Sequence, residues 1–222
     1  MGLLDFFSKM NLATGGTNPN DAIFSGLAAL GLQVKQQGMT GAELEGVYNG
    51  RAAAMVVDSS AVMGAAGAAM AQAAGTEVAG ALGLISTSFG RWRVRQNEYR
   101  ARSWMRNAQI SIRWAIVAAA SASGALEIGR SAETGPSIGN GLFAAGDTAL
   151  AGALQHPRLL EQLGAPTFDA ILVDGASVTA LWAPPMSEYQ KVVSRPEAVA
   201  KVTGDVLAAL SGVAYVICEG GR

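Results

Sequence analysis

Residues 168–185 read FDAILVDGASVTALWAPP, with two runs of apolar and β-branched residues on either side of Asp174-Gly175. An Asp-Gly pair between two such runs favours a tight turn that joins antiparallel strands. The stretch therefore predicts a β-hairpin in the last third of the chain.

Helices are predicted on both sides of this hairpin. Residues 146–164 carry apolar residues at helical spacing, and Pro157 is expected to bend or split that helix because it lacks an N–H donor. Residues 195–212 predict a second amphipathic helix, with Gly212 at its end. The tail, residues 213–222, is expected to add an edge strand.

The first third of the chain also predicts a helix followed by strands. Residues 21–30 have a helical pattern, and after them the period changes to two in three short runs: 32–38, 42–48 and 51–58. Asn49-Gly50 between the last two runs favours a type I′ turn, so the three runs predict an antiparallel meander.

A further strand is predicted in the middle of the chain. The pattern AQISIRWAIVAAAS, residues 108–121, indicates a largely buried strand, and residues 124–130 are expected to be its hairpin partner. The predicted fold class is therefore α+β: antiparallel β-hairpins and a meander with helices packed on one face, plus a helical insertion rich in Ala and Gly.

The predicted organisation has three parts, which can also join into one continuous domain after residue 20. The loop composition of SAETGPSIGNG, residues 131–141, places a boundary near the middle of the chain. The parts are an amphipathic segment and linker at 1–20, a helix with strands and the insertion 58–90 at 21–130, and a helix-hairpin-helix unit at 131–222.

The insertion is dominated by residues 61–83, AVMGAAGAAMAQAAGTEVAGALG. A transmembrane helix is disfavoured because Ala and Gly contribute little insertion free energy and Glu77 adds a cost of about 2.5 kcal/mol or more. Small residues recur at every fourth position and predict one or two close-packed helices, with a mobile insertion as the alternative. The small-residue stripe consists of Gly67, Ala71, Gly75, Ala79 and Gly83.

An arginine-rich stretch with interleaved aromatic residues follows at residues 91–106. Six arginines there face a single acid, Glu98, whereas the whole chain has a net charge of −1. The stretch is interpreted either as a strand and helix whose arginines pair with the protein's own acids, or as a surface for a membrane or another partner. The Arg/Trp belt consists of Arg91, Trp92, Arg93, Arg95, Arg100, Arg102, Trp104 and Arg106.

The N-terminal residues 3–10 predict a short amphipathic helix, because Leu3, Leu4, Phe6, Phe7 and Met10 are apolar whereas Asp5, Ser8 and Lys9 are polar. The segment is interpreted as an element that docks on the protein's own core. A shallow anchor on a membrane or in a partner's groove is the alternative.

The residue types that carry most enzyme chemistry are scarce. The chain has one Cys and one His, too few for a usual zinc site, and His156 is expected inside a helix without a nucleophile nearby. The motif GNGLFA, residues 139–144, has the letters of a dinucleotide-binding turn but no βαβ context. Asp147 is explained as an N-cap and Asp174 as a turn residue, which leaves Asp169 as the one regular-region acid without a structural role.

The sequence thus favours a non-catalytic structural, accessory or adaptor protein in a larger assembly of bacterial type. Only 15% of the residues are charged, against about 25% in an ordinary domain, so much of the surface is neutral and suited to contacts. Other proteins, including further copies of the chain, are the expected partners; no cofactor and no nucleic acid is expected. The expected location is the cytoplasm. A membrane-associated protein at the inner face of a membrane, and a small-molecule binder or enzyme with a carboxylate-based site, are the alternatives.

Overall fold

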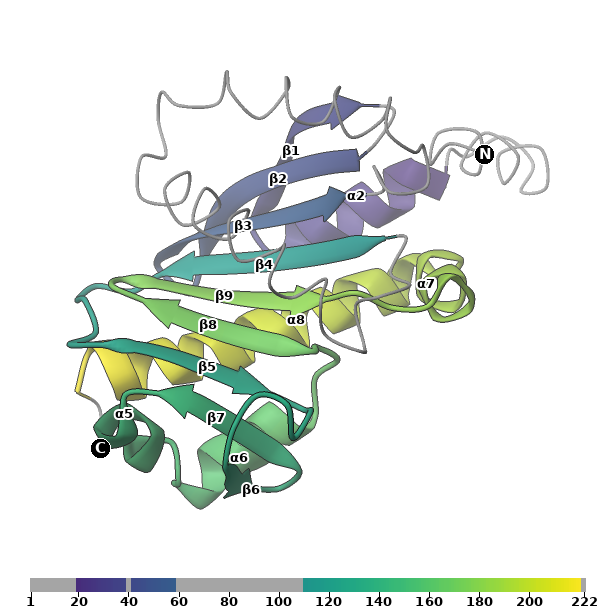
Figure 1. The fold of residues 1–222 in the computed structure, drawn as a ribbon. Coiled ribbons are helices and arrows are strands. Elements are labelled where there is room, and N and C mark those ends of the chain that lie inside the picture. Colours follow the sequence, from purple (N-terminus) through teal and green to yellow (C-terminus); the bar gives the residue numbers. More distant parts are fainter. Residues whose placement is uncertain (1–18, 39–40, 59–109, 221–222) are drawn as a thin grey trace.

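The structure is a computed structural model that describes residues 19–38, 41–58 and 110–220. The described strands form one nine-stranded antiparallel sheet in the order β1-β2-β3-β4-β9-β8-β5-β7-β6 (Figure 1). The strands are β1 Leu32–Gly38, β2 Gly41–Tyr48, β3 Arg51–Asp58, β4 Ser111–Val117, β5 Ala125–Gly129, β6 Ser137–Gly139, β7 Leu142–Gly146, β8 Ala170–Asp174 and β9 Ser177–Trp182. The helices are α2 Pro19–Ala29, α5 Thr148–Ala153, α6 Pro157–Gly164, α7 Met186–Val193 and α8 Pro196–Val213. The α+β class with antiparallel strands is therefore confirmed.

The β8–β9 hairpin predicted from residues 168–185 is confirmed and lies near the middle of the sheet. Its turn is one residue further along than expected, because Asp174 still pairs with Ser177 and the central turn residues are Gly175 and Ala176. Gly175 has φ +61°, a conformation that glycine adopts without steric cost. Because of this central position, the hairpin joins strands β1–β4 on one side of the sheet to strands β5–β7 on the other.

The expected pairing of residues 108–121 with residues 124–130 is wrong. β4 pairs with β3 on one side and β9 on the other, whereas β5 pairs with β8 and β7. The connection between β4 and β5 passes over the turn of the β8–β9 hairpin, where Ala118 N–H donates to Ala176 O and Ala122 N–H to Gly175 O. The hairpin is thus inserted between two strands that are consecutive in sequence, a long-range choice that local patterns do not specify.

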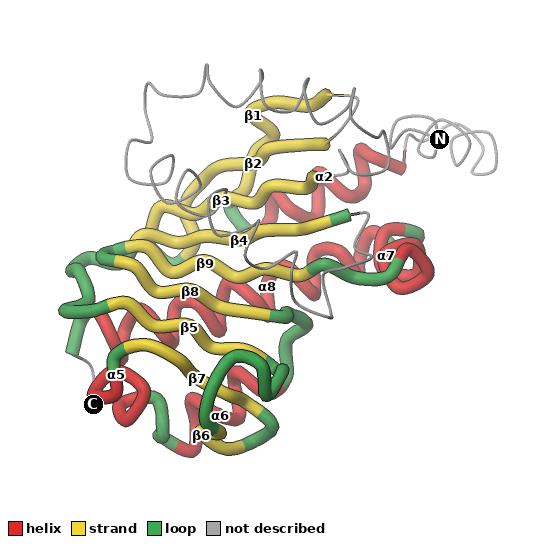
Figure 2. Tube along the Cα trace, in the orientation of Figure 1, coloured by secondary structure: helices red, strands yellow, loops and turns green. Residues whose placement is uncertain are grey.

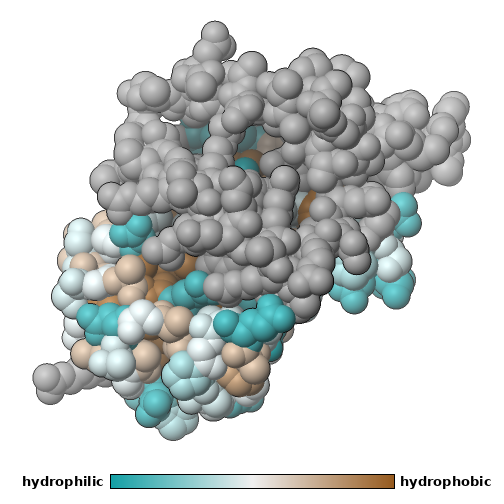
Figure 3. All heavy atoms as spheres, viewed as in Figure 1, coloured by the Kyte–Doolittle hydropathy of each residue, from teal (hydrophilic) through white to brown (hydrophobic). Residues whose placement is uncertain are grey.

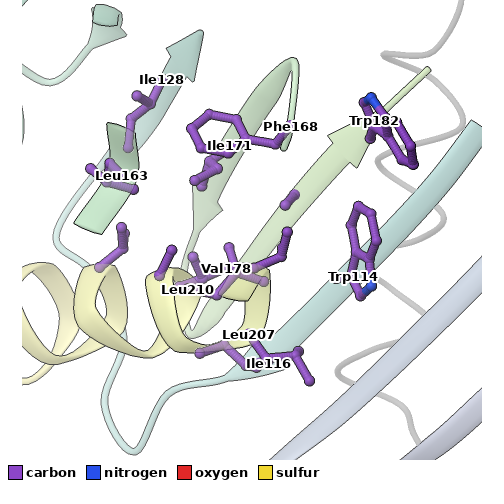
Figure 4. Close-up of a cluster of buried hydrophobic side chains, with 14 of the residues drawn as sticks. Trp114, Ile116, Ile128, Leu163, Phe168, Ile171, Val178, Trp182, Leu207 and Leu210 are labelled. Carbon is purple, nitrogen blue, oxygen red and sulfur yellow. The ribbon is translucent and has the colours of Figure 1, made fainter. Parts of the chain in front are cut away.

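Helices α2, α6 and α8 lie on one face of the sheet (Figures 1 and 2). The long α8 crosses behind β4 and β9, and its Leu207 and Leu210 are fully buried beside Ile116 and Val178 of these strands (Figure 4). Burial of a Leu or Ile side chain contributes about 1.5–3 kcal/mol, so this layer supplies a large part of the core. Figure 3 views the other face of the sheet, where the described surface mixes hydrophilic and hydrophobic residues.

The predicted end of α8 at Gly212 and the edge strand after it are both wrong. The helix continues to Val213 and then into a π-helical turn, Ala214–Cys218, whose apolar side chains are mostly buried. Gly212 lies opposite α6, and a Cβ there would approach Leu159 Cδ1 to 3.1 Å. Glycine at this position therefore allows close packing of α6 on α8 rather than ending the helix.

A polar clamp holds the end of this helical tail. Arg51 donates two hydrogen bonds to the Glu219 carboxylate, from Nε to Oε1 at 3.1 Å and from Nη2 to Oε2 at 2.6 Å. The backbone N–H of Ala119 also donates to Oε1. These hydrogen bonds hold the pKa of Glu219 below its usual range. The clamp thus ties the end of the chain's helical tail to β3 and to the loop after β4.

Among the described residues, one helix has the length and composition to cross a membrane, Pro196–Cys218, with a mean hydropathy of 1.4 in its most apolar window. Half of that window is buried inside the protein, as in the core helix of a globular fold. The buried half of its residues packs in the core, whereas Tyr215 is exposed.

The local signals at turns and helix starts are confirmed. Asn49 and Gly50 both have positive φ, as a type I′ turn requires. Pro157 separates α5 from α6, and the Asp147 carboxylate accepts hydrogen bonds from Ala149 N and Leu150 N at the start of α5. The predicted boundary near residue 130 falls between β5 and β6, and strands from both sides of it join the same sheet.

Replacing two glycines by alanine is expected to change stability in opposite directions. A Cβ at Gly46 would lie 1.7 Å from the carbonyl oxygen of Gly31, so G46A should lower the free energy of unfolding by about 1–3 kcal/mol. Gly152 in α5 has open space around it, so G152A should raise stability by about 0.5–1 kcal/mol through better helix propensity. Thermal unfolding of both variants beside the parent protein measures the difference, and equal effects would contradict this assignment.

Candidate functional site

The surface predicted from the small-residue stripe and the Arg/Trp belt lies outside the described residues. All of its residues fall within 59–109, so the structure does not test whether they contact a partner. The same holds for the amphipathic segment 3–10.

An apolar groove lies between α2, α7 and α8 on one side and strands β2, β3, β4 and β9 on the other. Its cavity volume is about 50 Å³, and its total free space, which includes open solvent, is about 650 Å³. Sixteen described residues line it: Ile23, Phe24, Leu27, Ala42, Leu44, Met55, Val57, Ile112, Trp114, Trp182, Tyr189, Val192, Val193, Val199, Val202 and Thr203.

The floor of the groove is formed by two tryptophans on neighbouring strands. Trp114 of β4 and Trp182 of β9 stack with their ring centroids 6.5 Å apart and an angle of 22° between the rings (Figure 4). Trp114 Nε1–H donates to the hydroxyl of Thr203 on α8 at 3.2 Å, and that hydroxyl lies 3.7 Å from Met55 Sδ. The Thr203 hydroxyl and the Trp114 indole N–H are thus paired within the floor, and the lining is mainly aromatic and aliphatic.

The walls of the groove are also apolar. Val192 of α7, Val202 of α8 and Val57 of β3 are only partly buried, whereas the floor is almost fully buried. Tyr189 of α7 is 3% exposed, and burial raises the pKa of its phenol, so it stays neutral. No charged side chain lines the groove among the described residues. An occupant must therefore bring apolar groups and leave its charges outside.

The size of the cavity limits what it can hold. A dry cavity that binds benzene measures about 150 Å³, and drug-sized ligands need about 300–1,000 Å³. A cavity of about 50 Å³ suits the end of one apolar side chain. A larger occupant has to extend out of the groove into solvent.

Asp169, which the sequence left without a structural role, has one. Its Oδ2 accepts a hydrogen bond from Ala183 N at 2.6 Å, and its own N–H donates to Leu181 O, so it fastens the start of β8 to the end of β9. Burial raises the pKa of Asp169, against the lowering effects of the Ala183 hydrogen bond and the Arg130 charge. The Glu188 charge adds a smaller raising effect, but the hydrogen bonds of Asp169 to the end of β9 give its carboxylate a structural role.

Arg130 beside it holds the loop before β8. Its guanidinium donates to the carbonyl oxygens of Leu163, Pro166 and Phe168, and lies over the Phe168 ring at 4.5 Å from the centroid. These contacts satisfy carbonyl groups at the end of α6 and in the loop that follows. Arg130 and Asp169 thus position the central hairpin rather than a ligand.

The remaining chemical candidates are also dispersed. His156 is at the N-cap position of α6 rather than inside a helix, and it makes no side-chain capping bond. Residues 139–144 form the β6–β7 hairpin, with Asn140 and Gly141 at positive φ, and not the strand-to-helix turn of a dinucleotide site. No group of three or more His, Cys, Asp or Glu gathers in the described parts of the chain.

The groove itself was missed by the sequence analysis. Its residues come from seven elements that are separated by up to about 180 positions in the chain, between Ile23 and Thr203. Each of them fits an ordinary core position of its own helix or strand, so no local signal marks them. Tertiary placement of α2 and α7 beside α8 is what brings them together.

No protein-family model, curated protein or solved structure matches the chain. The fold and the groove therefore define the protein by its structure: it is an α+β protein with a single antiparallel sheet and an apolar groove beside its longest described helix, α8.

The Trp114–Thr203 hydrogen bond should be measurable on its own. T203V removes the hydroxyl and leaves the indole N–H buried without its acceptor, so the free energy of unfolding should fall by about 1–3 kcal/mol. T203S keeps the acceptor, so the Trp114 ring N–H should stay protected from hydrogen exchange, as seen by NMR. Equal protection in T203V would show that the bond does not hold the floor.

Asp169 should make stability depend on pH in a defined direction. Because its pKa is raised on folding, the folded state binds a proton more readily than the unfolded state, and stability from this group is lost as pH rises through the folded pKa. D169N keeps an acceptor for Ala183 N–H without the charge. We expect its stability relative to the parent to be greater at neutral pH than at about pH 4, near the ordinary pKa of Asp. Urea unfolding at both pH values measures this, and the opposite trend would contradict it.

Proposed function

We propose that the protein is a non-catalytic accessory or adaptor protein of a larger assembly, of bacterial type and in the cytoplasm, that holds an apolar segment of a partner protein in this groove. The observation that carries the proposal is a groove lined by apolar side chains of three helices and four strands, open at partly buried valines. Burial of apolar surface is the main favourable term in protein association, so such a groove suits a partner's apolar side chains.

A protein segment fits the groove better than a small-molecule cofactor does. Small-molecule sites place a few polar groups to fix orientation, whereas the hydroxyl and indole N–H here are paired with each other. The cavity takes the end of one side chain, and a longer segment would extend past the partly buried Val192 of α7 and Val202 of α8. An amphipathic helix places apolar residues at i, i+3 and i+4 on one face and binds in such grooves.

Addition of a partner strand to the sheet is disfavoured at both described edges. The edge strand β1 carries Lys35 and has a register shift between Val34 and Gln36. The other edge, β6, has three residues and a shift between Ser137 and Gly139. Lysines, bulges and short strands protect sheet edges from pairing. The groove is therefore the more suitable contact surface among the described elements.

The proposal is tested by selecting short peptides from a displayed library on the folded protein. We expect enriched peptides with large apolar residues at i, i+3 and i+4 spacing. The groove variants V202D and V192D place a charge on two different walls and should weaken binding at least about tenfold, since about 1.4 kcal/mol corresponds to a factor of ten.

The matched control is A208D, because Ala208 is exposed on the same helix as Val202 and does not line the groove. Thermal unfolding verifies that each variant is folded. The proposal fails if the selection yields no such peptides, or if the peptides bind V202D and A208D equally well.

A further inference from the structure

Several residues that border the segments outside the described ranges lie close to the groove. Gly41 pairs with Asp58, and Asp58 pairs with Ser111, so these three residues lie together at the same end of strands β2, β3 and β4. The residues next to them, Ala42, Val57 and Ile112, line the groove. α2 begins at Pro19, and its Ile23 and Phe24 are also lining residues. Residues 1–18 and 59–109 therefore both connect to the fold close to the groove.

These two segments differ in what they can offer an apolar groove. Residues 3–10 have five large apolar side chains: Leu3, Leu4, Phe6, Phe7 and Met10. Residues 61–83 are mainly Ala and Gly, residues 84–90 have three large apolar side chains against the five of residues 3–10, and residues 91–106 carry six arginines. Because the lining lacks charged side chains among the described residues, an arginine-rich occupant would be desolvated without compensation. Size and charge together favour residues 3–10.

We propose that residues 3–10 of the same chain occupy the groove, so that a partner protein must displace them. The inference rests on the proposed function, because it assigns an internal competitor to the same site. It makes the N-terminal segment a regulator of partner binding. In this arrangement the polar residues of the segment, Asp5, Ser8 and Lys9, would face the solvent.

The connecting residues are long enough for this contact. Residues 11–18 number eight and span about 26–29 Å when fully extended. The 11 residues of α2, by comparison, form a helix about 16 Å long. A short tether of this kind gives an effective concentration on the order of millimolar. Even weak docking then fills the groove for much of the time. The partner's apparent affinity is reduced in proportion to the fraction of protein molecules whose groove is empty.

The test compares the full-length protein with a chain that lacks residues 1–12, and uses a fluorescein-labelled peptide of residues 1–12 as the probe. Fluorescence anisotropy should show that the peptide binds the truncated chain at least about fivefold more tightly than the full-length protein. V202D in the truncated chain should abolish this binding, and A208D should leave it unchanged. A peptide with F6S and F7S is the matched control and should not bind.

The alternative outcomes separate the two proposals. If the truncated chain binds the library-selected peptides but not the peptide of residues 1–12, this inference is overturned and the proposed function stands. If it binds neither, both are overturned. Equal binding of the probe to V202D places the contact elsewhere and overturns the inference. A full-length dimer that truncation converts to a monomer, seen by light scattering, would place the segment in another copy and overturn the same-chain assignment.

Discussion

Packing of α8 on strands β4 and β9 is the contact on which the rest of the fold depends. The two strands are neighbours only because the β8–β9 hairpin is inserted between β4 and β5. Their inward side chains, such as Ile116 and Val178, meet the apolar side of α8 at Leu207 and Leu210. α2, α6 and α7 in turn pack against α8. A loss of apolar surface on α8 would therefore affect every part of the helical layer.

The groove follows from the same packing. α2 and α7 both lie against α8, and the space that remains between them over the sheet ends is apolar because core-facing positions of all the surrounding elements point into it. Polar side chains elsewhere in the described fold serve structural contacts, such as Arg130 at the end of α6 and Arg51 at Glu219. These contacts hold the ends of elements, and the Trp114–Thr203 hydrogen bond holds the groove floor, which leaves mainly apolar surface for binding.

Local chemistry predicted much of the fold, and long-range pairing did not. The Asn49-Gly50 turn, the Asp147 cap and the Pro157 break each depend on a few adjacent residues, and the structure confirms them. The position of β5, the continuation of α8 past Gly212 and the role of Asp169 depend on distant parts of the chain. The groove belongs to the second kind. The sequence-predicted surface within residues 59–109 stays a prediction.

The pairing of Asp58 with Ser111 has a consequence for how the gene can vary. The sheet itself holds Asp58 and Ser111, the residues that flank the segment 59–109, side by side. Each doubling of such a connection adds only about 0.6 kcal/mol of closure entropy. We therefore expect the fold to tolerate insertions and deletions between these two strands.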